Sequence, residues 1–170
     1  MWLRHQSFLR KGHVMSKLAF IFPGQGAQKA GMGKDFYENS ETARSFFDQA
    51  QKILDFDLKE MCFGEHEELN LTEYTQPCMV SVCLAIVQEL KKRGINPDIT
   101  AGLSLGEYAA VAAAGGMNEL DAIKLVRRRG ILMQSTVPAG EGAMAAVLGL
   151  DAKKIEEILE SFENVWIANY

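Results

Sequence analysis

The chain has 170 residues and a mass of 18.8 kDa, with 48% apolar and 24% charged residues. This length allows one compact domain with a hydrophobic core, and the composition is that of a globular protein rather than a disordered or collagen-like one. The formal charge is 18 − 22 = −4, and no run of about 18 apolar residues is present. We therefore expect neither nucleic acid nor a membrane as a partner.

The first fourteen residues carry three basic side chains and no acidic one. A secretory signal is excluded because it needs an apolar run of about 7–15 residues, so we expect residues 1–14 to be an unstructured leader, with a short targeting signal as the alternative. Three cysteines, Cys62, Cys78 and Cys83, are too few and too irregularly spaced for a disulfide framework or a zinc site. We expect reduced, mostly buried thiols in a cytoplasmic protein.

Apolar patterning predicts alternating strands and helices. Residues 18–22 form a short apolar run that suits a buried parallel strand, and a glycine-rich turn follows it. Residues 55–74 read as an acidic connecting region, and Pro77 is expected in the first turn of the helix that comes next. We expect helices at 41–54, 77–90, 105–114 and 119–136, a strand at 99–101, and then strand, helix and strand at 143–150, 152–160 and 165–170. This alternation indicates an α/β fold with a mainly parallel sheet.

The sequence GLSLG at residues 102–106 matches the pattern G-x-S-x-G between an expected strand and an expected helix. In that setting Ser104 would lie on a sharp, strained turn with its hydroxyl exposed as a nucleophile. The alternative is a serine that only caps the helix. A nucleophilic serine needs a base, but His5, His13 and His66 have no persuasive place beside Ser104, and we expect them on the surface.

The turn Pro23-Gly24-Gln25-Gly26 fits neither the Walker pattern nor G-x-G-x-x-G. A glycine-rich turn after a parallel strand can still present backbone N–H groups to an anion. An oxyanion hole would combine one N–H from such a loop with that of the residue after the nucleophile, Leu105. A simple turn is the alternative.

Three arginines follow one another in the helix expected at 119–136. At about 100° per residue, Arg127 points nearly opposite the apolar arc and Arg128 lies near its edge. Arg129 falls in the middle of the arc made by Ala122, Leu125, Val126 and Met133. A guanidinium there needs an anionic partner or a wet pocket. Both an ion pair with a carboxylate such as Glu107 and a paired hydrogen bond to a substrate carboxylate remain open.

Five motifs occur in a fixed order: PGQGAQ with GMG at 23–33, TQP at 75–77, GLSLGEY at 102–108, RGxxMQ at 129–134 and PxGxGAMAAVLGL at 138–150. Together they resemble the malonyl-CoA:acyl carrier protein transacylases of fatty acid synthesis, over residues 17–170. The resemblance implies an α/β-hydrolase-like parallel-sheet core at residues 15–137. It also implies the beginning of a ferredoxin-like subdomain at residues 138–170.

The resemblance further implies a transferase in which Ser104 takes malonyl from malonyl-CoA as an ester. The serine then passes it to the phosphopantetheine thiol of acyl carrier protein. Gln25 and Leu105 match the residues whose backbone N–H groups form the oxyanion hole, and Arg129 matches the ligand of the malonyl carboxylate. Neither a metal nor a cofactor is implied beyond the coenzyme A thioester that serves as substrate.

The sequence departs from the family pattern at two points. Leu103 stands where the family usually has histidine, and family members run to nearly twice this length with their catalytic histidine in the second half. We therefore expect an apparently truncated, amino-terminal portion. Two alternatives to malonyl transfer are an inactive or binding-only fragment and a serine esterase. A neutral ester would leave Arg129 without a partner, which speaks against the esterase.

Overall fold

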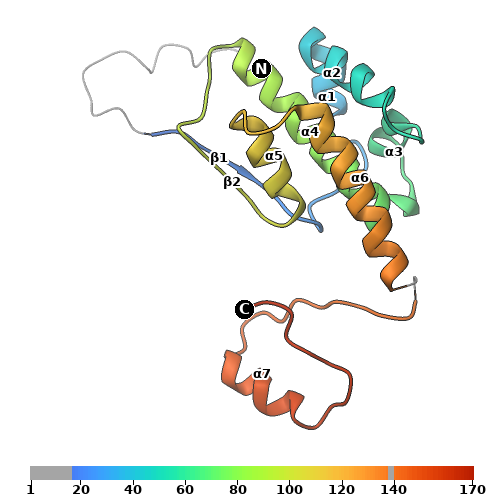
Figure 1. The fold of residues 1–170 in the computed structure, drawn as a ribbon, viewed down its shortest axis with the longest axis vertical. Helices are drawn as coiled ribbons and strands as arrows, with labels where there is room; N and C mark the ends of the chain where they lie inside the picture. The colour runs from blue at the N-terminus through green and yellow to red at the C-terminus, as the bar shows by residue number, and fades with distance from the viewer. Residues whose placement is uncertain (1–16, 138–139) are drawn as a thin grey trace. The chain divides into compact units, whose positions relative to one another are not determined.

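The computed structural model describes residues 17–137 and 140–170 (Figure 1). The chain divides after Val137 into two compact units. The expected leader at residues 1–14, with His5 and His13, lies outside the described residues. No helix in the described part of the chain combines the length and apolar character that a bilayer crossing requires.

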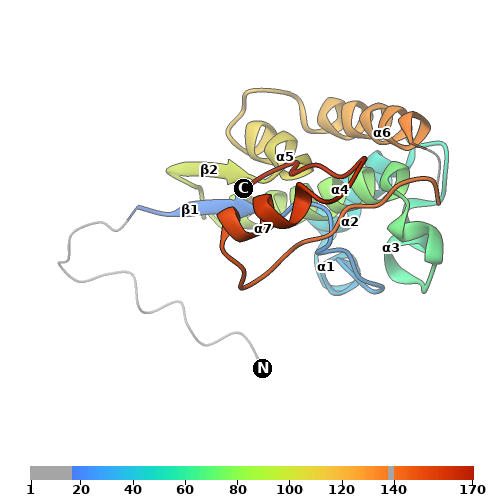
Figure 2. The same cartoon turned by 90° about the horizontal axis from the view of Figure 1, so that it is seen from below.

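The first unit contains a small parallel sheet. Strands β1 (Ala19–Phe22) and β2 (Ile99–Gly102) pair in parallel, with Ala19 opposite Ile99 and Phe22 opposite Gly102 (Figure 2). At the start of the pair, Asp98 accepts a hydrogen bond from the backbone N–H of Leu18 at 2.8 Å and donates its own N–H to the Leu18 carbonyl. Helix α5 packs on both strands. The expected α/β class with a parallel sheet is confirmed.

Helices make up most of the remaining structure. Ser40 and Asn118 cap α2 and α6 by accepting hydrogen bonds from backbone N–H groups of their first turns. The helices expected at 41–54, 105–114 and 119–136 are therefore present with small shifts at their ends. In chain order the helical elements are α1 (Lys34–Asn39), α2 (Glu41–Gln51), α3 (Leu58–Phe63), the 3-10 turn η1 (Glu67–Asn70), α4 (Thr72–Lys92), α5 (Leu105–Ala113), α6 (Glu119–Thr136) and α7 (Ala152–Leu159).

Helix α4 is the centre of the core. It packs against α2, α5 and α6, and α6 lies along it in Figure 1. Its residues from Thr75 to Val80 are all buried, as expected for a helix that is apolar on nearly every side. Cys62 and Cys78 are buried free thiols, and burial raises the pKa of the half-buried Cys83 thiol to about 11. The largest fully buried apolar side chains of the core are Phe47, Leu58, Leu84, Leu105, Ile123, Val80, Val87 and Val126.

The start of α4 differs from the expectation. The acidic region at 55–74 contains α3 and η1, and α4 begins at Thr72, so Pro77 lies beyond the first turn. A proline there leaves the carbonyl four residues earlier, that of Glu73, without its helical donor. That carbonyl instead accepts a hydrogen bond from Arg127 Nη1 at 2.8 Å. A partner on α6 thus makes the interior proline compatible with the helix.

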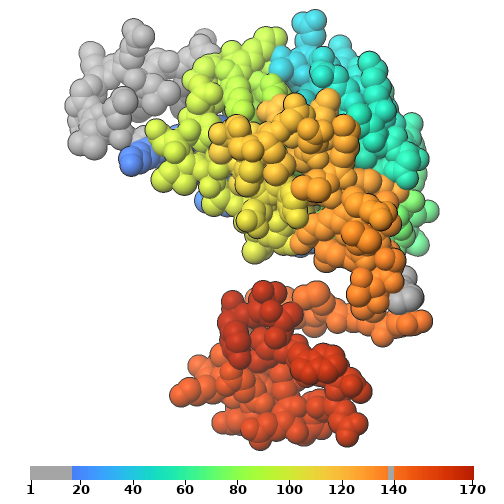
Figure 3. Space-filling model, in the orientation of Figure 1, coloured from blue at the N-terminus to red at the C-terminus, as the bar shows by residue number. Residues whose placement is uncertain are grey.

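The buried face of α6 also differs from the expected arc. Its buried residues are Ala122, Ile123, Val126 and Gly130, whereas Leu125 and Met133 are 49% and 46% exposed. The outer side of α6 (orange) forms part of the face seen in Figure 3. Because of this rotation, Arg127 and Arg129 flank the buried stripe on its two sides. The expectation that Arg127 points away from the core is wrong.

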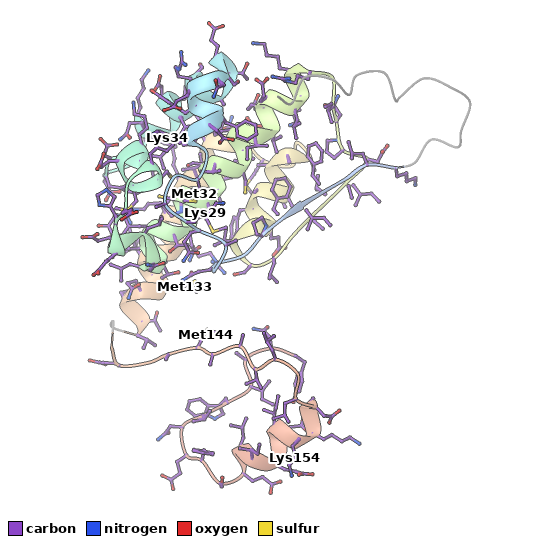
Figure 4. All side chains as sticks on the ribbon, turned by 180° about the vertical axis from the view of Figure 1, so that it is seen from behind. Lys29, Met32, Lys34, Met133, Met144 and Lys154 are labelled. Atoms are coloured by element: carbon purple, nitrogen blue, oxygen red, sulfur yellow. The ribbon has the colours of Figure 1, made fainter. Side chains whose placement is uncertain are left out.

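The second unit contains α7, which begins at its capping residue Asp151. The strands expected at 143–150 and 165–170 are not formed; in the described residues 140–170 neither segment pairs with a strand. A strand requires a hydrogen-bonding neighbour, which a pattern of apolar residues does not supply. Met144 lies on the extended segment before α7, and Lys154 lies on α7 (Figure 4). Met144 is 82% exposed.

Candidate active site

Ser104 lies on the turn between β2 and α5. Its backbone angles are φ 52° and ψ −111°, a conformation that residues other than glycine rarely adopt. The residue is exposed, and its hydroxyl accepts no capping hydrogen bond from the first turn of α5. The capping alternative is therefore wrong. The strained turn holds the hydroxyl outward, as the nucleophile interpretation requires.

Two glycines make this turn possible. A Cβ atom on Gly102 would lie 2.1 Å from the carbonyl oxygen of Gly106. A Cβ atom on Gly106 would lie 2.5 Å from the carbonyl oxygen of Phe22 in β1. The Leu103 N–H donates to that same Phe22 oxygen at 3.1 Å, so the turn remains attached to the sheet. Backbone therefore packs on backbone on both sides of Ser104.

Arg129 approaches Ser104 from α6. Its Nη2 donates to Ser104 Oγ at 3.2 Å, and its Nη1 donates to the side-chain oxygen of Gln76 at 2.6 Å. The guanidinium lies 5.7 Å from the centre of the Tyr108 ring. None of the ion pairs among the described residues includes Arg129, so the alternative of an ion pair with Glu107 is wrong. The structure brings Ser104 and Arg129 together and leaves the cation facing neutral partners.

A chain of hydrogen bonds leads from Arg129 to the glycine-rich loop. Gln76 Nε2 donates to Thr72 Oγ1 at 3.1 Å, and that hydroxyl donates to Gln25 Oε1 at 2.6 Å. The Thr72 N–H donates to Gln134 Oε1 at 3.2 Å. The sulfur of Met133, labelled in Figure 4, lies 3.4 Å from Gln76 Nε2. Gln25, Ser104 and Arg129 thus belong to one network.

Thr72, Gln76 and Gln134 were not identified as site residues from the sequence. Gln76 and Gln134 stand in motifs that carry the family resemblance, but no role was assigned to them. Gln76 is fully buried, and a buried amide needs hydrogen-bond partners. An amide inside an otherwise apolar helix was therefore the signal that could have pointed to it.

The backbone N–H groups of Gln25 and Leu105 donate to no acceptor in residues 17–137 or 140–170, and Leu105 itself is buried. A Cβ atom on Gly24 would lie 3.1 Å from the Leu103 carbonyl oxygen, so the loop and the serine turn pack closely. His66 does not join the site: its Nε2 lies 3.0 Å from Glu60 Oε1. The described residues contain no group of three or more His, Cys, Asp or Glu side chains that could hold a metal ion.

A strained serine at a strand-to-helix turn beside a cation is an arrangement suited to acyl transfer. The acyl transferase domain family matches residues 19–170, and the chain belongs to this family.

Within the family, the chain is similar to the malonyl CoA-acyl carrier protein transacylase of Bacillus subtilis. The two are 48% identical over 147 residues, which cover 86% of this chain and 46% of the relative. The solved transacylase of Coxiella burnetii matches with a TM-score of 0.80 and 41% identity, over 88% of this chain and 48% of that one. A malonyl-transacylase solved in complex with a type II polyketide acyl-carrier protein matches with a TM-score of 0.79 and 39% identity, over 85% and 48%.

These matches confirm the family resemblance and the α/β fold with its small parallel sheet. The chain spans about half the length of the curated relatives it matches.

Proposed function

We propose that this chain takes part in the transfer of a malonyl group from malonyl-CoA to the phosphopantetheine thiol of acyl carrier protein. The malonyl group would be carried as an ester on Ser104. The observation that carries the proposal is the pairing of an exposed hydroxyl on a strained turn with an arginine that has no carboxylate partner in the described residues. A malonyl thioester has a carbonyl carbon for the serine and a carboxylate for Arg129, at opposite ends of a three-carbon unit. The two protein groups match these two ends.

The reaction would proceed in two exchanges. Ser104 Oγ attacks the thioester carbonyl carbon and gives up its proton to a base, and the carbon–sulfur bond breaks so that coenzyme A leaves as the thiol. The thiol of phosphopantetheine then attacks the ester, and the carbon–oxygen bond breaks to restore the serine hydroxyl. The N–H groups of Gln25 and Leu105 would bind the oxygen that becomes negative in each step. No metal and no further cofactor is needed.

His66 is not placed as the base of this reaction, because its hydrogen-bond partner is Glu60, whereas the Ser104 hydroxyl bonds Arg129. This observation favours one second candidate, a chain that binds malonyl-CoA without turnover. The serine esterase is disfavoured, since a neutral ester would leave the guanidinium of Arg129 without an anion.

The geometry of the serine turn also supports a more specific proposal for the fold. A nucleophile on a tight turn after a parallel strand, packed on the neighbouring strand through glycines, is the arrangement of an α/β-hydrolase-like core. We assign residues 15–137 to such a core. Residues 138–170, with α7 between extended segments, would begin a ferredoxin-like subdomain.

Incubation of the chain with malonyl-CoA, followed by intact-mass measurement, tests the proposal. We expect one malonyl adduct on the unaltered chain and none on Ser104→Ala. The control Ser45→Ala removes an exposed serine of α2 and should keep the adduct. An adduct that persists in Ser104→Ala refutes the assignment. Binding of malonyl-CoA without any adduct, measured by calorimetry, would instead support the binding-only candidate.

A further inference from the structure

We propose that Arg127 is a positioning residue for the malonyl site: it holds the first turn of α4 in place, and thereby orients Gln76 toward Arg129 and Thr72 toward Gln25. The consequence for acyl selectivity rests on the proposed function. The positioning itself depends only on contacts in the structure.

The guanidinium of Arg127 makes hydrogen bonds to two acidic residues and packs beside two aromatic rings. Its side chain is 12% exposed, and it binds both oxygens of Asp55, with Nε to Oδ1 at 2.8 Å and Nη2 to Oδ2 at 2.9 Å. Its Nη1 donates to the carbonyl oxygen of Glu73 at 2.8 Å and to the Glu73 carboxylate at 3.2 Å. The guanidinium also lies 5.1 Å and 4.9 Å from the ring centres of Phe56 and Tyr74.

The contact with the Glu73 carbonyl replaces a missing helical bond. Pro77 has no N–H to donate to that carbonyl, so the first turn of α4 is tied less firmly to the rest of its own helix. Arg127 supplies the absent donor from α6. The orientation of this turn is consequently set by a residue of another helix.

The start of α4 carries the two residues that reach the site, Thr72 in the first turn and Gln76 at the beginning of the second. Thr72 immediately precedes Glu73, and Gln76 follows it by three positions on the same helix. Thr72 bonds Gln25, and Gln76 bonds Arg129. The two helices touch closely here, since a Cβ atom on Gly130 would lie 2.8 Å from the Thr72 carbonyl oxygen. A shift of the turn would therefore move both hydrogen bonds, and the grip on the substrate with them.

A purely structural ion pair offers the matched control. Lys59 bonds Asp48 at 3.2 Å and lies 5.5 Å from the ring centre of Tyr37, so it combines a salt bridge and an aromatic contact as Arg127 does. Its partners lie on α2 and α1 and have no hydrogen bond to the site network. Arg127→Gln and Lys59→Gln each remove one such cation. Asp55→Asn is a milder variant that keeps Arg127 and weakens its paired hydrogen bond.

Side-chain ¹⁵N–¹H spectra of the full chain test the positioning directly. We expect the Arg129 Nε–H and Gln76 amide signals, assigned through Arg129→Lys and Gln76→Glu, to shift or broaden in Arg127→Gln and to remain unchanged in Lys59→Gln. Asp55→Asn should move them in the same direction by less. Unchanged signals in a folded Arg127→Gln would overturn the proposal. If that variant does not fold, unchanged signals in Asp55→Asn would overturn it.

The selectivity of acylation supplies a second measurement. The ratio of the Ser104 acylation rates with malonyl-CoA and acetyl-CoA should fall about tenfold in Arg127→Gln, because a misdirected guanidinium no longer meets the carboxylate. It should stay the same in Lys59→Gln. An equal loss with both thioesters would indicate a structural role only and overturn the proposal. If the unaltered chain takes up no malonyl group, the proposed function fails, while the spectra still decide whether Arg127 positions Arg129.

Discussion

Adding one methyl group at Gly106 should damage the serine turn severely. The Cβ atom of Gly106→Ala would lie 2.5 Å from the Phe22 carbonyl oxygen and 2.6 Å from that of Pro23. Ordinary contact begins at 3.4 Å, so α5 and β1 must separate by about 3.4 − 2.5 = 0.9 Å. Both obstacles are backbone atoms, and no side-chain rotation can relieve the collision.

The cost can be estimated from its parts. Overpacking in a close-packed interior costs about 1–3 kcal/mol, and a contact between backbones belongs at the upper end of that range. Separation also weakens the hydrogen bond from Leu103 N–H to the Phe22 oxygen, which is worth about 1 kcal/mol. Alanine is favoured over glycine in a helix by about 1 kcal/mol, which offsets part of the loss. The net destabilisation is about 3 kcal/mol, a large share of the stability of a small domain.

Gly94→Ala is the matched control for this measurement. Gly94 has φ 77°, and a Cβ atom there would meet nothing within 4 Å, so only the left-handed backbone costs energy, about 1 kcal/mol. Urea unfolding followed by circular dichroism would give both free energies. A Gly106→Ala variant that is no less stable than Gly94→Ala would refute the view that backbone packing holds the turn.

Two further predictions concern charge. Arg129→Ala should slow malonyl transfer to Ser104 by about 100-fold or more and acetyl transfer far less. The reason is that two charge-assisted hydrogen bonds of about 1.5–3 kcal/mol each are lost only with the diacid. Equal losses with the two thioesters would refute the carboxylate role. Hydrogen bonds from Arg127 hold the pKa of Asp55 below its ordinary value of 3.8, so the pair stabilises the fold above that pH, and the stabilisation disappears as pH falls through the lowered pKa. Asp55 is 66% exposed, so Asp55→Asn should cost at most about 1 kcal/mol in urea unfolding at pH 7, and the cost should shrink progressively as the pH is lowered below 3.8. A difference that stays constant with pH would contradict this assignment.

The sequence located the elements whose signals are local. The strand at Ala19–Phe22 and the helices α2, α5 and α6 follow from apolar spacing and from turn or capping residues within each segment. The start of α4 could not be found in this way, because Pro77 looks like a first-turn residue. The helix begins five residues earlier, and the Glu73 carbonyl that lacks its helical donor is bonded by Arg127 from α6, far along the chain.

The site shows the same division. Ser104 could be identified because strand, turn glycines and helix are contiguous in the sequence. Arg129 could be assigned an anionic partner, but the ion-pair alternative was removed only when the structure showed hydrogen bonds to Gln76 and Ser104 and no carboxylate partner in the described residues. The contacts of Arg127 with Asp55 and Glu73 could not be predicted, because the buried face of α6 is rotated from the arc that its apolar residues predict.

Ser104 is held in place by backbone contacts and Arg129 by side-chain contacts. This difference determines which substitutions the site can tolerate. Gly102 and Gly106 fix Ser104 through backbone contacts that no larger residue can replace. Arg129 is fixed through side chains, Gln76 and its supporting turn, which other side chains could in principle replace. Changes in acyl selectivity should therefore arise more readily at α4 and α6 than at the serine turn. Substitutions around Gln76 and Arg127 would alter which acyl group is favoured before they abolish acylation of Ser104.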